Sequence, residues 1–246
     1  MKNTFKEAKR LDNIELLRII GMLMVVTLHF LGRGGVSEKA QTFSGAYYLT
    51  SLWDGICTIS VNVYVLISGY FLVKSKFKIK KLLAIVLQVI TYSLGFWLLF
   101  VVLGFRRFNY VELIKSAFPL LTYQYWFASA YVGLYILFPF VNKALCAMDK
   151  KQHKTLCIIL FCLFTFYLPS RALVVNGYSI MWMVSLYIFG AYLRLYYQPQ
   201  GTVTGKLILY YIVPTLLLPC TRFGIDFMGE ILSIDVSIYS KFFYKN

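Results

Sequence analysis

The stretch IELLRIIGMLMVVTLHF, residues 14–30, decides the fold class, because it is long and apolar enough to cross a lipid bilayer. It nevertheless contains the ionisable residues Glu15, Arg18 and His29. Burying such side chains in a membrane is costly, so they are functional candidates by default. The segment FLGRGG follows without a small-residue cleavage site, and the stretch is therefore expected to remain as a first span.

The composition of the whole chain is that of an integral membrane protein. Of its 246 residues, 59% are hydrophobic and only 14% are charged, whereas soluble domains are about 25% charged. The net charge of +15 fits the positive-inside bias and contact with anionic lipid. No nucleic-acid-binding motif is present, so nucleic acid is not an expected partner. The five cysteines show no CxxC spacing and predict neither a disulfide framework nor a zinc site, so no metal is expected.

The apolar windows predict an all-α integral membrane protein with a bundle of about seven transmembrane helices, in a single domain over residues 1–246. Helices are expected because lipid offers no partners to the backbone polar groups. The charged segment after residue 220 is too short and too acidic to be expected to cross unaided. The predicted spans are 14–32, 48–73, 82–104, 121–142, 155–170, 180–197 and 207–220.

Loop charges predict the orientation of these spans. Lysine and arginine are concentrated in the N-terminal tail, in the connection KSKFKIKK at 74–81 and in the connection at 143–154. The intervening connections carry fewer basic residues. This asymmetry predicts a multi-pass protein of the cell membrane with its N-terminus in the cytoplasm.

Arg18 and His29 are eleven residues apart, which places them on nearly the same face of a helix and about 16 Å apart along its axis. Glu15 precedes Arg18 by three residues, so an ion pair is expected. Spacing alone leaves other interpretations open: Arg18 can snorkel to lipid phosphates, and His29 can be a packing or interfacial residue. His153 lies in a lysine-rich connection and is expected to be solvated.

The second span contains the polar or small residues Asn62, Ser68 and Gly69, and small residues permit close helix approach in membranes. The basic connection after it can bind anionic lipid, or it can hold the phosphates of a nucleotide-like donor. Its candidate lysines for the second role are Lys78, Lys80 and Lys81.

Aromatic residues open the fourth span, where Tyr125 and Trp126 fit an aromatic belt at the membrane interface. Aromatic rings also stack on sugars, so Trp126 is a candidate for acceptor binding. The sequence has no P-loop, nucleophile elbow or HExxH motif, so a soluble-type hydrolase or ATPase is not supported.

Three motifs in order resemble the membrane acyltransferase family often called acyltransferase family 3. They are RLDNIELLRIIGMLMVVTLH at 10–29, VNVYVLISGY at 61–70 and WFASAYVGLYILFP at 126–139. The resemblance implies transfer of an acyl group, preferably acetyl, from cytoplasmic acyl-CoA. The implied acceptor is a hydroxyl of an extracytoplasmic or lipid-linked saccharide, such as a bacterial surface polysaccharide. No bound cofactor is implied, since acyl-CoA is a substrate.

The same resemblance assigns roles to residues of this chain. His29, Arg18 and Glu15 form the expected catalytic set. The imidazole takes the acceptor's hydroxyl proton or carries the acyl group itself, and Arg18 pairs with donor phosphate or with Glu15. Asn62 and Ser68 are expected to line or support the site.

The sequence also departs from the family pattern. Lys80 and Lys81 stand where family members carry arginines, and Ala84 stands where a third basic residue is expected, so weaker donor binding follows. Family domains have about ten spans, so the chain resembles an incomplete, C-terminally shortened domain. The alternatives are a polysaccharide polymerase or flippase-type membrane protein, and an inactive truncated remnant.

Overall fold

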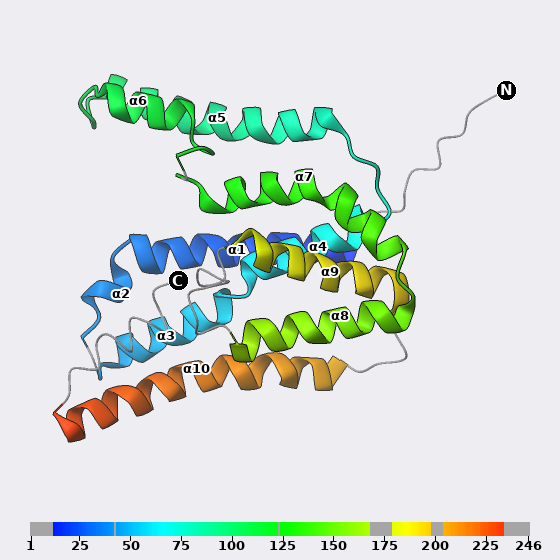
Figure 1. The fold of residues 1–246 in the computed structure, drawn as a ribbon. Helices are drawn as coiled ribbons and strands as arrows, with labels where there is room; N and C mark the ends of the chain where they lie inside the picture. The colour runs from blue at the N-terminus through cyan, green and yellow to red at the C-terminus, as the bar shows by residue number, and fades with distance from the viewer. Residues whose placement is uncertain (1–11, 42, 123, 168–178, 198–203, 234–246) are drawn as a thin grey trace. The chain divides into compact units, whose positions relative to one another are not determined.

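The computed structural model describes residues 12–41, 43–122, 124–167, 179–197 and 204–233. Within these ranges every regular element is a helix (Figure 1). The elements are α1 (Asp12–Arg33), α2 (Val36–Lys39), α3 (Gly45–Cys57), α4 (Ser60–Leu72), α5 (Ile79–Val102), α6 (Tyr110–Ala117), α7 (Trp126–Cys146), α8 (Lys150–Cys162), the π-helix η1 (Leu163–Tyr167), α9 (Ile180–Tyr196) and α10 (Thr204–Leu232).

The prediction of an all-α membrane protein is confirmed. Five helical segments are long and apolar enough to cross a bilayer: α1, α3 together with α4, α5, α7 and α10. The predicted spans 155–170 and 180–197 correspond to the shorter helices α8 with η1 and α9, and residues 168–170 lie outside the described ranges. The last span differs from its expected limits, since α10 continues from residue 220 to Leu232.

Polar side chains fix where several helices begin. Ser44 accepts a hydrogen bond from the backbone N–H of Tyr47 at the start of α3, and Ser179 does the same for Trp182 at the start of α9. Asp149 forms a reciprocal capping box with Gln152 at the start of α8. Such caps satisfy N–H groups that lack a partner inside the helix.

The described helices form two compact units, and each is considered by itself. The first unit contains α1, α2, α3, the larger part of α4 up to Ile67, and α10. Within it, α3 packs against α1 and also against α10. The helix that carries Arg18 and His29 therefore belongs to the same unit as the last helix of the chain.

The second unit runs from Ser68 to Tyr197. Within it, α7 packs against both α5 and α9, and α8 packs against α9. The centre of this unit is apolar and aromatic, with Phe138 and Leu134 of α7 and Tyr187 and Ala191 of α9 fully buried. Helix α9 is short, but most of its length is enclosed by protein.

Gly69 allows α4 to lie directly on α9 in the second unit. A Cβ atom added at this position would overlap the backbone carbonyl oxygen of Tyr187. The expectation that a small residue permits close helix approach holds here. Because the obstacle is backbone, a side-chain rotation cannot relieve the overlap.

We expect Gly69→Ala to destabilise the protein by about 1–3 kcal/mol, the usual cost of overpacking. The measurement is the thermal unfolding midpoint in detergent, which should fall by several degrees. Gly95→Ala in α5 is the matched control, because nothing lies within 4 Å of the added Cβ and alanine favours a helix interior. Equal midpoints for the two variants would contradict the close approach.

The prediction that His153 is solvated is wrong. Its side chain is fully buried in the second unit, and its Nε2 lies 3.1 Å from the carbonyl oxygen of Ile188. The rings of Tyr192 and Tyr196 pack edge-to-face against it. The neighbouring lysines are exposed. His153 is buried because it lies on the side of α8 that packs against α9.

Burial lowers the pKa of His153 below its ordinary value of about 6.5, while the hydrogen bond to Ile188 opposes this shift in part. As the pH falls toward and below about 6.5, residue 153 is protonated more readily in the unfolded chain than in the folded protein. The free energy of unfolding should therefore decrease as the pH falls from about 7 to about 5. Thermal unfolding across this range measures the effect.

His153→Asn removes the titrating ring, so its unfolding midpoint should depend less on pH than that of the wild type. The assignment fails if His153→Asn keeps the full dependence.

Candidate active site

Helix α1 carries Arg18 and His29 without interruption from Asp12 to Arg33. At 1.5 Å per residue the two side chains start about 16 Å apart, and their directions differ by only about 20° around the axis. Glu15 pairs with Arg18, with 2.8 Å between Oε1 and Nη1, as the spacing predicts. The structure therefore brings the expected catalytic residues onto one helix face.

The geometry of His29 fixes which ring nitrogen carries the proton. Its Nδ1 lies 2.9 Å from the carbonyl oxygen of Val25, one turn earlier in α1. A carbonyl oxygen only accepts hydrogen bonds, so Nδ1 is the donor and the neutral ring holds its lone pair on Nε2. The ring is exposed. Nε2 is therefore the atom that can receive a proton from a substrate.

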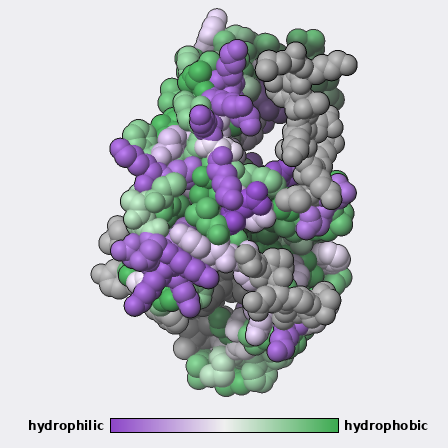
Figure 2. Space-filling model, turned by 90° about the vertical axis from the view of Figure 1, so that its right-hand side faces the viewer, coloured by the Kyte–Doolittle hydropathy of each residue, from purple (hydrophilic) through white to green (hydrophobic). Residues whose placement is uncertain are grey.

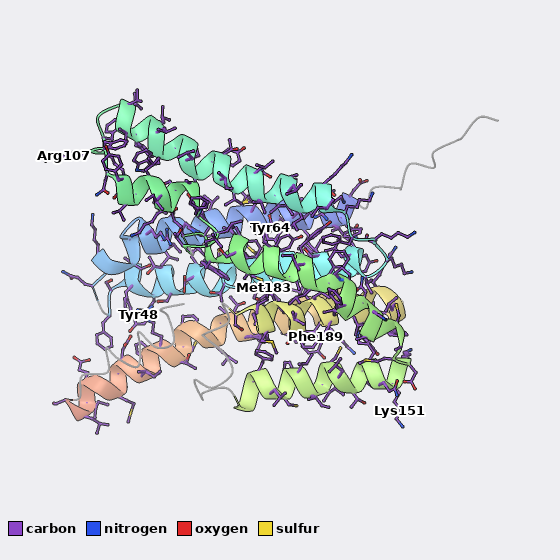
Figure 3. The ribbon with its side chains drawn as sticks, turned by 45° about the horizontal axis from the view of Figure 1, so that its top comes forward. Tyr48, Tyr64, Arg107, Lys151, Met183 and Phe189 are labelled. Carbon is purple, nitrogen blue, oxygen red and sulfur yellow. The ribbon has the colours of Figure 1, made fainter. Side chains whose placement is uncertain are left out.

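The packed side of α1 is organised by Tyr64 of α4, labelled in Figure 3. The Tyr64 hydroxyl donates a 2.6 Å hydrogen bond to the backbone carbonyl of Arg18. A Cβ at Gly21 would come within 3.2 Å of the same ring, so glycine permits this packing. Asn62, two residues earlier on α4, is half-buried.

Ser68 belongs to the second unit, where its hydroxyl lies 3.2 Å from that of Tyr131 on α7. Nearby, Asn142 donates a 2.9 Å hydrogen bond to the carbonyl of Leu72 and accepts a 2.7 Å bond from the Tyr187 hydroxyl. These bonds hold the end of α4 against α7 and α9. Ser68 is thus part of a polar ladder between helices.

Residues of α7 hold the basic connection after α4, and the lysine side chains of the connection are exposed. The Tyr135 hydroxyl donates to the carbonyl of Lys78 at 3.4 Å, and Phe77 packs near the rings of Tyr135 and Phe138. Lys78, Lys80 and Lys81 are exposed. Figure 2 faces the side of the protein that carries this connection and shows hydrophilic side chains gathered there.

Trp126 is the first residue of α7 and is half-buried. It precedes Tyr135, which anchors Lys78, by nine residues, or about 14 Å along the helix. The structure therefore does not bring Trp126 to the lysines within the second unit. Tyr123, which also lies in this aromatic stretch, is outside the described residues.

Sequence reasoning missed a charged network between α3 and α10 in the first unit. Arg222 donates from Nε to the hydroxyl of Tyr47 at 2.6 Å and from Nη1 to Ser51 at 2.8 Å. The Tyr47 hydroxyl donates to Asp226 at 2.8 Å, and the Arg222 guanidinium lies 4.0 Å from the centre of the Tyr47 ring. Tyr47, Ser51 and Asp226 are buried.

This network explains why α10 extends past the expected limit. The prediction treated the charges after residue 220 as a barrier, but α3 supplies hydrogen-bonding partners for Arg222 and Asp226. The signal was the matched i,i+4 spacing of Tyr47 with Ser51 and of Arg222 with Asp226, which places each pair on one helix face.

The comparison with known families indicates which kind of reaction the protein catalyses. A family model described as "Acyltransferase domain" matches residues 11–245. The chain belongs to acyltransferase family 3. It is therefore a multi-pass membrane acyltransferase. No curated protein and no solved structure matches the chain.

Across the part of the chain that the structure describes, no three His, Cys, Asp or Glu side chains gather as a metal site would require. The groups available to this acyltransferase on α1 are an imidazole, a guanidinium and a carboxylate. They suit proton transfer and binding of anionic groups.

Proposed function

We propose that this acyltransferase moves an acyl group, preferably acetyl, from acyl-CoA to a hydroxyl of a saccharide. The acceptor would be extracytoplasmic or lipid-linked. The observation that carries the proposal is the exposed His29 ring, whose Nδ1–H is bound to Val25 and whose Nε2 is left as the base. Family membership supports acyl transfer over polysaccharide polymerisation or flipping.

In the proposed reaction, Nε2 of His29 removes the proton of the acceptor hydroxyl while the oxygen attacks the thioester carbonyl. The new C–O ester bond forms, the C–S bond breaks, and the imidazolium returns its proton to the leaving thiolate. Arg18 would pair with donor phosphate through its guanidinium fork, and Glu15 would orient it. Atoms and charge balance without an added reactant.

We further propose that the protein lies in the cell membrane with its N-terminus in the cytoplasm, as the loop charges predict. The lysine connection would then meet acyl-CoA, and Trp126 would face the acceptor. Support comes from the exposure of Lys78, Lys80 and Lys81 and from the length of α7 between Tyr135 and Trp126. Asn62 in the first unit and Ser68 in the second would each line or support the site, as the family resemblance implies.

We expect His29→Ala to reduce acyl transfer about 10²–10⁴-fold, the usual cost of removing a positioned acid–base group. The measurement is transfer of radiolabelled acetyl from acetyl-CoA in membranes that contain the chain. Phe30→Ala is the matched control, since this exposed neighbour lies outside the catalytic set. Near-normal transfer by His29→Ala would remove this residue from the mechanism.

We expect joint replacement of Lys78, Lys80 and Lys81 by Gln to raise the KM for acyl-CoA about tenfold, if each exposed charge contributes about 0.5 kcal/mol. The acceptor requirement should stay the same. Lys150→Gln with Lys151→Gln on α8 is the control, because these lysines are also exposed. An unchanged KM together with weaker lipid association would make the connection a lipid contact instead.

A further inference from the structure

Helix α6, in the second unit, packs against α5 and exposes apolar residues on its other side. Its side toward α5 carries Ser116, which is buried, and Glu112, which is 44% exposed and accepts a 3.3 Å hydrogen bond from Trp97 Nε1. Its outward side carries Tyr110, Val111 and Ile114, which are 74%, 58% and 58% exposed. A helix facing water would place its polar side outward and its apolar side inward.

The apolar surface extends through the whole segment from Leu103 to Leu121. Phe108 packs between the buried Trp97 ring and Tyr110, with ring centres 5.5 and 4.9 Å apart. The remaining members of this surface are also exposed, and they are Leu103, Phe105, Phe118 and Leu121. Exposed apolar residues concentrated in one short segment mark an interaction site.

The segment is fixed to the end of α5, a helix long enough to span a membrane. Gly104 adopts the left-handed conformation, with φ of 74°, and the N–H of Arg106 bonds to the carbonyl of Phe100 at 3.1 Å. Asn109 caps α6. The 24 residues of α5 reach about 36 Å, which exceeds a hydrocarbon core of about 30 Å. The segment therefore begins where a bilayer meets its headgroups.

The charges of the segment indicate what covers the patch. Arg106, Arg107 and Lys115 are exposed, and Glu112 is the segment's single acidic residue in the sequence. Glu112 is already paired with Arg106 at 3.6 Å, which leaves Arg107 and Lys115 as net positive charge. Figure 3 shows Arg107 at the turn between α5 and α6.

We infer that Leu103–Leu121 is an interfacial docking surface for anionic phospholipid. The outward side of α6 sits at the boundary of the acyl chains, and Arg107 and Lys115 bind headgroup phosphates. Basic residues beside an apolar helix face are the usual chemistry of such attachment. This inference does not depend on the acyl transfer proposed above.

The test places a bimane fluorophore on Ile114→Cys in the full chain, with the five natural cysteines replaced by alanine, reconstituted in lipid vesicles. Leu87→Cys on the exposed side of α5 is the reference inside the bilayer, and Lys151→Cys at the start of α8 is the aqueous reference. Iodide in water and brominated phosphatidylcholine or phosphatidylglycerol serve as quenchers. The Ile114 label should be shielded from iodide and quenched by brominated lipid.

Brominated phosphatidylglycerol should quench this label more strongly than phosphatidylcholine. Each of the two cations should favour phosphatidylglycerol over phosphatidylcholine at this site about fivefold, the equivalent of about 1 kcal/mol. Arg107→Gln with Lys115→Gln should abolish the preference and leave the Arg106–Glu112 pair intact. Lys150→Gln with Lys151→Gln, on α8, should leave it unchanged.

Three results would overturn the inference. Access of iodide to the Ile114 label equal to that at Lys151 would place the helix face in water. Shielding from both iodide and brominated lipid would show that protein, such as a second copy of the chain, covers the patch. Equal quenching by the two lipids would remove the role of headgroup charge.

Discussion

Polar groups that enter a bilayer must find partners inside the protein, and the rest of this structure depends on that constraint. It makes every described regular element a helix. It also accounts for the network of Arg222, Tyr47 and Asp226, in which hydrogen bonds of 2.6 and 2.8 Å link the three side chains. Without α3, the second half of α10 would carry its charges into lipid. The two helices therefore form a structural pair despite their separation in sequence.

The second unit meets the same constraint with tyrosine and asparagine. Tyr187 donates to Asn142, which in turn donates to the carbonyl of Leu72 at the end of α4, an oxygen that also accepts from the N–H of Ser75. Because the bond from Asn142 goes to backbone, it holds the start of the lysine connection and leaves the lysine side chains exposed. Tyr135 acts in the same way on the carbonyl of Lys78. A backbone fixed by hydrogen bonds and exposed lysine side chains suit a surface that binds phosphate, whether the phosphate belongs to a donor or to lipid.

Local patterns predicted the helices well, and partners distant in sequence account for what was missed. Hydrophobic length located the helices that correspond to the seven predicted spans but gave no sign of the short helices α2 and α6, and the i,i+3 spacing found the Glu15–Arg18 pair. The end of α10 was placed too early, because the partners of Arg222 lie on α3, some 170 residues earlier. The burial of His153 was missed because its lysine neighbours are exposed, whereas α9 covers the side of α8 on which His153 lies. Composition predicts neither which helices pack together nor which face of a helix is buried by a neighbour.

The two histidines show why the same side chain serves packing in one place and suits chemistry in another. His153 binds the carbonyl of Ile188 through Nε2, and aromatic rings close around it, so a substrate has no access. His29 uses Nδ1 instead, and its partner is the carbonyl of Val25 in its own helix. That bond requires no other element, so the tautomer is set as soon as α1 forms. An exposed Nε2 lone pair is the consequence, and this arrangement follows from the sequence of one helix alone.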